Sequence, residues 1–167
     1  MFFLTKFRHN HIVVLSTEVP LIPDFDANGN LPPGVHRAVW KVFSKRFGNS
    51  EHRKTLLDGL ATALNSLAAT GCRSVYINGS FVTKKLEPGD YDLCWSIDGV
   101  APERLDPVLL DFSPAGRLAM KAKYRGDLFP AEVPEGASGK AFLDFFQTDK
   151  RTGEPKGIVL LDLGGVK

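Results

Sequence analysis

An apolar stripe between residues 50 and 71 limits the folds open to this chain more than any other feature of its sequence. Ser50 is a good helix cap, and Gly71 is a good helix end. Because the stripe recurs at helical spacing, one face of this helix must be buried against another layer. The residues of the stripe are Leu56, Leu57, Leu60, Leu64, Leu67 and Ala68.

Short strands after this helix are expected to supply that layer. Residues 74–78 and 92–97 are rich in apolar and β-branched side chains and predict the first two strands. Residues 127–133 predict a third strand, and Pro130 within it favours an edge strand or a short one. A further strand is expected at 158–163, after the aromatic segment 142–146 and a turn.

Two more helices complete the expected layers. The apolar residues between Val35 and Phe47 recur at helical spacing, and Gly48 ends this first helix. Ser113-Pro114 opens another helix that runs to about Tyr124. This order predicts an α/β (α+β) fold: a small mixed sheet with helices packed on it, two of them leading.

The length of 167 residues suits one domain, which we expect over 35–167, after a Pro-, Gly- and Asn-rich arm over 1–34. A net charge of +2 is too mild to predict a dedicated nucleic-acid-binding protein. We find no stretch typical of a signal peptide or a membrane span, so we expect a cytoplasmic protein with no membrane partner. The sequence has no P-loop, HExxH or GxSxG motif, which argues against those enzyme classes.

A polar constellation links the first two strands. Gly79 and Ser80 end the first strand, and after nine intervening residues Asp90 and Asp92 begin the second. A Gly-Ser turn offers backbone N–H groups and a hydroxyl to phosphate oxygens. Asp90 and Asp92 leave the same face of a strand, roughly 7 Å apart, and two such carboxylates can bind divalent cations. By themselves, a helix cap and a Pro-Gly-Asp turn are the plainer interpretations of the two halves.

The pattern Gly79-Ser80, nine residues, Asp90-Tyr91-Asp92 resembles the signature of the polymerase-beta-like nucleotidyltransferase superfamily. It also resembles a narrower group of bacterial nucleotidyltransferase-like proteins that have no assigned reaction. The segments shared with that group are 30–36, 46–48, 78–83, 90–95, 145–149 and 156–157. The resemblance implies that Gly79 and Ser80 grip a nucleoside triphosphate while Asp90 and Asp92 bind Mg²⁺ or Mn²⁺.

The same resemblance implies a third carboxylate on a later strand. Asp127 is our candidate because it follows the helix that ends near Tyr124, and Asp144 and Glu132 are the alternatives. In a catalytic member this residue binds metal and helps to deprotonate the attacking hydroxyl.

Basic residues offer further candidates. Lys84, just after the Gly-Ser turn, is our candidate phosphate contact, against the alternative of a solvated basic turn formed with Lys85. Two other basic groups are interpreted either as a nucleotide or polynucleotide path or as exposed surface. These are Arg117, Lys121 and Arg125 in one helix, and Lys150, Arg151 and Lys156 around a turn.

Three functions are therefore expected candidates. The first is transfer of a nucleoside monophosphate from an NTP to a hydroxyl on RNA, a protein or a small molecule. The second is a weakly active or inactive binding module, such as the partner subunit of a toxin–antitoxin or phage-defence pair. The third is a nucleotide sensor without turnover. A protein encoded nearby and a second copy of the chain are the candidate protein partners.

Overall fold

The computed structural model of the protein describes residues 21–164. Its strands form one mixed sheet in the order β1-β5-β2-β3-β4. The pairs β1–β5 and β3–β4 are parallel, whereas β2 runs antiparallel to both β5 and β3. The elements are β1 (Gly34–Ala38), α1 (Trp40–Phe47), α2 (Glu51–Ala69), β2 (Ser74–Asn78), the 3₁₀ helices η1 (Ser80–Val82), η2 (Pro102–Arg104) and η3 (Pro107–Leu110), β3 (Tyr91–Trp95), α3 (Pro114–Tyr124), β4 (Gly126–Pro130), α4 (Phe142–Phe145) and β5 (Gly157–Asp162).

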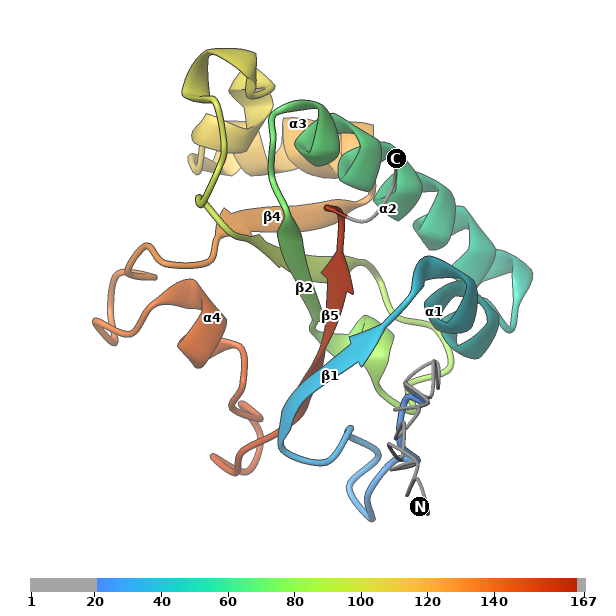
Figure 1. Ribbon diagram of the computed structural model, residues 1–167. Helices are drawn as coiled ribbons and strands as arrows, with labels where there is room; N and C mark the ends of the chain where they lie inside the picture. The colour runs from blue at the N-terminus through green and yellow to red at the C-terminus, as the bar shows by residue number, and fades with distance from the viewer. Residues whose placement is uncertain (1–20, 165–167) are drawn as a thin grey trace, which may run out of the picture.

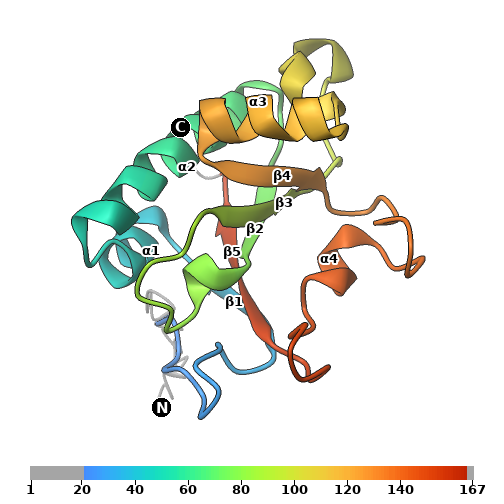
Figure 2. The same ribbon diagram turned by 180° about the vertical axis from the view of Figure 1, so that it is seen from behind.

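The helices cover the two faces of the sheet unequally. Helices α1, α2 and α3 lie on one side, and the short α4 lies on the other (Figures 1 and 2). The main core joins the leucines of α2 to Phe43 of α1, Met120 of α3 and the sheet. A smaller aromatic cluster under α4 joins Phe129 to Phe142. The predicted class, a small mixed sheet with helices packed on it, is confirmed.

Side chains along β3 alternate between the two faces of the sheet. Tyr91 and Leu93 belong to the main core, and Cys94 belongs to the smaller cluster. Successive side chains of a strand point to opposite faces, so Asp92 points to the α4 side. Polar groups at this end of the strand are therefore kept out of the main core.

Two helices begin where their capping residues predict. The Ser50 hydroxyl accepts a hydrogen bond from the Arg53 N–H at 3.2 Å, and α2 follows it. The Ser113 hydroxyl accepts one from the Gly116 N–H at 3.1 Å before α3. Such caps satisfy N–H groups that have no partner within the helix.

The predicted helix from Val35 to Phe47 is wrong in its first third. Residues 34–38 form β1, which pairs with β5 from Gly34↔Gly157 to Ala38↔Leu161. Only the apolar residues from 42 onward face the core from a helix, while Val35 is 44% exposed. The backbone of β1 gains ladder hydrogen bonds from β5, a partner more than 100 residues away that local spacing does not reveal.

The strand expected at 127–133 covers Gly126–Pro130, so it ends at the proline that favoured a short strand. Its edge position is confirmed, since β4 is the last strand of the sheet that residues 21–164 form and lies beside β3. Residues 1–20 of the expected N-terminal arm lie outside the described residues. From residue 21 on, the arm packs onto the domain, and its Ile22 and Leu31 are buried in the main core. No helix among residues 21–164 is long and apolar enough to cross a lipid bilayer.

Candidate functional site

Gly79 and Asp92 are in direct contact at the end of the β2–β3 hairpin. Asn78 is the register partner of Asp92, and Gly79 follows it with φ of 76°, a conformation that favours glycine. A Cβ atom built on Gly79 would lie 2.1 Å from the Oδ2 atom of Asp92. Only glycine leaves room for this carboxylate beside the turn, so the structure brings together the two halves of the predicted constellation.

Ser80 opens η1, a single turn of 3₁₀ helix. The Ser80 carbonyl accepts a hydrogen bond from the Thr83 hydroxyl at 2.7 Å, which holds the turn closed.

Sheet register brings Asp127 to the aspartate pair. Strands β3 and β4 are parallel, and Asp92 is the register partner of Asp127. Their side chains therefore leave the same face of neighbouring strands. Asp90 directly precedes β3, two residues before Asp92. We call Asp90, Asp92 and Asp127 the acidic cluster.

The two alternative third carboxylates lie elsewhere. Glu132 follows the far end of β4, where its carboxylate accepts hydrogen bonds from the Ser96 hydroxyl at 2.7 Å and the Ile97 N–H at 3.1 Å. Asp144 is exposed on α4. Of the three candidates, Asp127 is the one whose backbone pairs with that of Asp92.

Two cations from α3 reach the acidic cluster. The Lys121 Nζ atom lies 2.5 Å from the Asp90 Oδ2 and 3.1 Å from the Asp127 Oδ2. Arg117, one turn earlier, places a guanidinium nitrogen 2.6 Å from the Asp127 Oδ2. Of the three basic residues that were interpreted as a polynucleotide path or as exposed surface, Arg117 and Lys121 therefore contact carboxylates. Sequence spacing gave no signal for this, because the contact depends on how α3 packs beside β4.

Asp92 differs from its neighbours in having no cation partner among the described residues. Burial raises the pKa of Asp92 to about 6, and the negative charges of Asp90 and Asp127 add to the rise. The positive charges of Lys150 and Lys156 act in the opposite direction. Above about pH 6, Asp92 therefore carries a negative charge that no ion pair within residues 21–164 neutralises.

Asp92 lines a cavity whose volume is about 780 Å³. Three segments form most of its wall: residues 27–30 of the arm, residues 79–85 after β2, and residues 146–156 between α4 and β5. Asp92 of β3 completes it. The lining residues are Ala27, Asn28, Gly29, Asn30, Gly79, Ser80, Thr83, Lys84, Lys85, Asp92, Phe146, Thr148, Asp149, Lys150, Arg151 and Lys156. Five are basic and two are acidic, so the cavity suits an anion.

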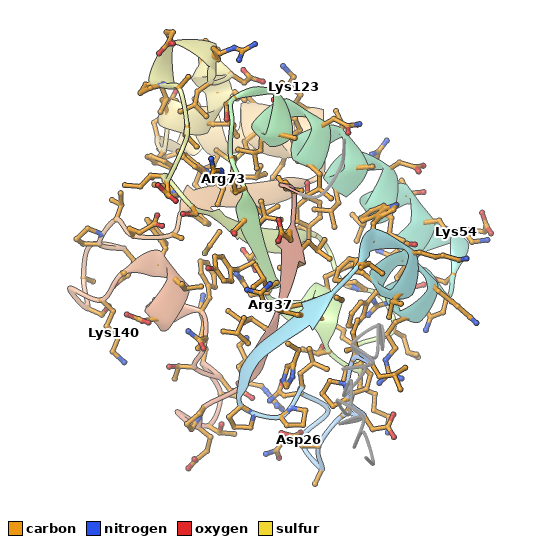
Figure 3. The ribbon with its side chains drawn as sticks, in the orientation of Figure 1. Asp26, Arg37, Lys54, Arg73, Lys123 and Lys140 are labelled. Carbon is orange, nitrogen blue, oxygen red and sulfur yellow. The ribbon has the colours of Figure 1, made fainter. Side chains whose placement is uncertain are left out.

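Hydrogen bonds hold the arm against the other two segments. The Asn30 side-chain amide donates to the Asp149 carboxylate at 2.8 Å, and the Lys84 N–H donates to the Gly29 carbonyl at 2.8 Å. Asp26, labelled in Figure 3, accepts from the N–H groups of residues 28 and 30 and shapes the turn. Sequence reasoning missed Asn30 and Asp149 as cavity residues, although both fall in segments that carried the resemblance.

A second, smaller cavity of about 270 Å³ lies beside Asp90. His52 and Thr55 of α2 line it together with Lys121 and Arg125. Asp92 opens on the first cavity and Asp90 on the second, so the acidic cluster stands between them.

The donor set limits how a metal can bind. Within residues 21–164, no group of three or more His, Cys, Asp or Glu side chains is arranged to hold a metal ion. Magnesium is commonly held by one or two carboxylates together with phosphates and water. Asp92 is open to a basic cavity and offers one carboxylate of that kind. Asp90 is paired with Lys121, and Asp127 is paired with both Lys121 and Arg117.

Comparison with known proteins identifies a family without adding an activity. No curated protein and no solved structure matches the chain. A family described as a family of unknown function, DUF6932, matches residues 23–162, which include both cavities and the acidic cluster. The chain belongs to the DUF6932 family.

Proposed function

We propose that the protein is a metal-dependent nucleotidyltransferase that transfers a nucleoside monophosphate from an NTP to a hydroxyl on RNA, a protein or a small molecule. One observation carries the proposal: the uncompensated carboxylate of Asp92 touches Gly79 and opens on a cavity with five basic side chains. A polyphosphate and a divalent cation together complement these opposite charges. The proposal places the reaction in the cytoplasm.

In this proposal, separate residues bind the phosphates and the metal. Gly79, Ser80 and Lys84 contact the phosphates in the first cavity. Asp92 and Asp90 hold Mg²⁺ or Mn²⁺, with Asp127 as the third carboxylate. The metal, when bound, supplies neutralisation of phosphate charge.

The acceptor approaches from the second cavity, beside Asp90. Its hydroxyl oxygen bonds to the α-phosphorus, the bond from that phosphorus to the bridging oxygen breaks, and pyrophosphate leaves. A carboxylate of the acidic cluster takes the hydroxyl proton. Positioning and charge neutralisation provide most of the catalysis in such transfers.

A binding module with weak or no activity is the second candidate, as in a toxin–antitoxin or phage-defence partner subunit. The contacts of Lys121 and Arg117 favour it, because they neutralise Asp90 and Asp127 without a metal. If these ion pairs persist when nucleotide binds, only Asp92 is left to hold a cation.

Label transfer separates the two candidates. We would incubate the protein with each α-³²P-labelled NTP, Mg²⁺ or Mn²⁺ and total bacterial RNA, and then follow label in RNA and in protein. We expect transfer by the wild type, loss of at least about 100-fold in Asp92→Asn and Asp90→Asn, and retention in the exposed control Asp144→Asn. Transfer that survives in Asp92→Asn rejects the mechanism. Nucleotide binding without transfer by the wild type supports the binding module.

A further inference from the structure

Lys156 holds a fixed place in the wall of the first cavity. Its N–H donates to the Gln147 carbonyl at 2.9 Å, and the next N–H, of Gly157, donates to the Leu31 carbonyl at 2.9 Å. A Cβ atom on Gly157 would lie 2.1 Å from the Pro32 carbonyl oxygen, so glycine is required for this approach. The backbone of Lys156 is thereby fixed between the arm and the segment that follows α4.

The Lys156 ammonium is a half-buried cation with no ion-pair partner among residues 21–164. Burial lowers its pKa, and the carboxylates of Asp149 and Asp92 oppose that change without forming an ion pair with it. The Asp149 carboxylate is taken by Arg151 at 3.1 Å and by the Asn30 amide. A partly desolvated cation without a partner is costly for a fold, which points to a ligand that supplies the missing negative charge.

The other basic residues of the cavity differ from Lys156 in exposure. Lys84, Lys85 and Lys150 are exposed, and Arg151 already has a carboxylate partner. Exposed lysines keep most of their hydration and add long-range attraction. Lys156 lines the same cavity as Gly79, Ser80 and Asp92. Because its ammonium is already partly stripped of water, an anion bound there would displace less water and would interact with the ammonium more strongly than with an exposed lysine.

We propose that Lys156 is the main anchor of a polyphosphate site in this cavity, and that the site binds polyphosphate without a metal. The inference rests on the proposed function for its nucleotide substrate, and it extends that function by naming the binding residue and the order of binding. Five basic side chains against two acidic ones give the cavity the positive excess that a metal-free polyphosphate needs. The nucleotide thus enters through its phosphates, ahead of any contact of the metal with Asp92.

The test uses inorganic tripolyphosphate, which has neither base nor sugar, in buffer with EDTA. Calorimetry should detect binding to the wild type, and Lys156→Met should bind at least tenfold more weakly. The matched control is Lys54→Met, an exposed lysine on α2 that Figure 3 labels on the side of the molecule away from α4. The control should bind within twofold of the wild type, and Lys156→Arg should recover part of the loss. ATP should compete with tripolyphosphate, and adenosine should not.

A second measurement separates a ligand anchor from a structural lysine. If the Lys156 ammonium gains a charge partner only when an anion binds, its replacement by methionine leaves the Tm of the ligand-free protein at least as high as that of the wild type. A large fall in the Tm of ligand-free Lys156→Met would instead assign the lysine to the fold and overturn the proposal. Tripolyphosphate binding that is absent from the wild type, or unchanged in Lys156→Met, overturns it as well.

Failure of this inference is distinct from failure of the transferase proposal. Lys156-dependent binding without label transfer rejects the transferase and keeps the anchor. Label transfer at wild-type KM and kcat by Lys156→Met keeps the transferase and rejects the anchor.

Discussion

Replacing Lys121 with methionine is the sharpest perturbation of the acidic cluster. Methionine keeps much of the stem but removes the ammonium that bridges Asp90 at 2.5 Å and Asp127 at 3.1 Å. Asp127 then keeps Arg117 as its partner, and Asp90, with a side chain that is 30% exposed, is partly hydrated. These conditions lie between those of an exposed ion pair and those of a buried one.

The expected loss follows from that intermediate position. Exposed pairs contribute up to about 1 kcal/mol, and breaking a buried pair costs about 3–5 kcal/mol. The Asp127 side chain is only 3% exposed, but the Lys121 side chain is 40% exposed, so solvent screens its contribution. We expect Lys121→Met to lose about 1–2 kcal/mol of the free energy of unfolding, which corresponds to a Tm lower by about 3–6 °C at this chain length.

Chemical and thermal unfolding at pH 7 in EDTA would measure this loss, with Lys123→Met as the control. Lys123 lies on the same helix and also pairs with an aspartate, Asp106, away from the acidic cluster. Adding Mn²⁺ should then raise the Tm of Lys121→Met more than that of the wild type, because a position for a cation has been vacated. The reasoning is refuted if Lys121→Met loses no more stability than Lys123→Met and gains no more from Mn²⁺.

Two further predictions concern Asp92 and its glycine neighbour. Because its folded-state pKa of about 6 lies above the value of 3.8 for a free aspartate, charging Asp92 lowers stability progressively from about pH 4 to pH 6. Asp92→Asn should therefore exceed the wild type by about 2 kcal/mol in urea unfolding at pH 8 and match it near pH 4; an unchanged gap across that range contradicts the assignment. Gly79→Ala should lose about 1–3 kcal/mol in the same assay, because a Cβ atom would strain the backbone and collide with Asp92. Equal urea midpoints for Gly79→Ala and the wild type would show that the turn has room for a side chain.

Local signals were enough to predict most of the helices and strands. Ser50 and Ser113 cap their helices as expected, and the segments around 74–78 and 92–97 do form neighbouring strands. Each of these depends on residues close in the sequence. Strand β1 was missed because the strand with which it pairs, β5, is more than 100 residues away along the chain.

Parts of the candidate site could likewise be predicted from local sequence, whereas other parts depend on how distant segments pack. The contact between Gly79 and Asp92 follows from a hairpin, so the motif itself implies it. Asp127 was ranked ahead of Asp144 and Glu132 by its order along the chain, and the parallel register of β3 and β4 explains why it lies opposite Asp92. The roles of Lys121 and Lys156 depend on how α3 and the segment before β5 pack, which no local pattern encodes.

These two lysines explain how opposite charges coexist at one end of the sheet. Lys121 reaches Asp90 and Asp127 from α3 and offsets part of their negative charge. Lys156 stands in the first cavity with Asp92, yet forms no ion pair with it among the described residues. If Lys156 served to neutralise the acidic cluster as Lys121 does, we would expect it to form an ion pair with Asp92. Asp92 and Lys156, which form no ion pair among residues 21–164, instead share a cavity. The proposed binding of a polyphosphate together with a divalent cation would supply both missing charges.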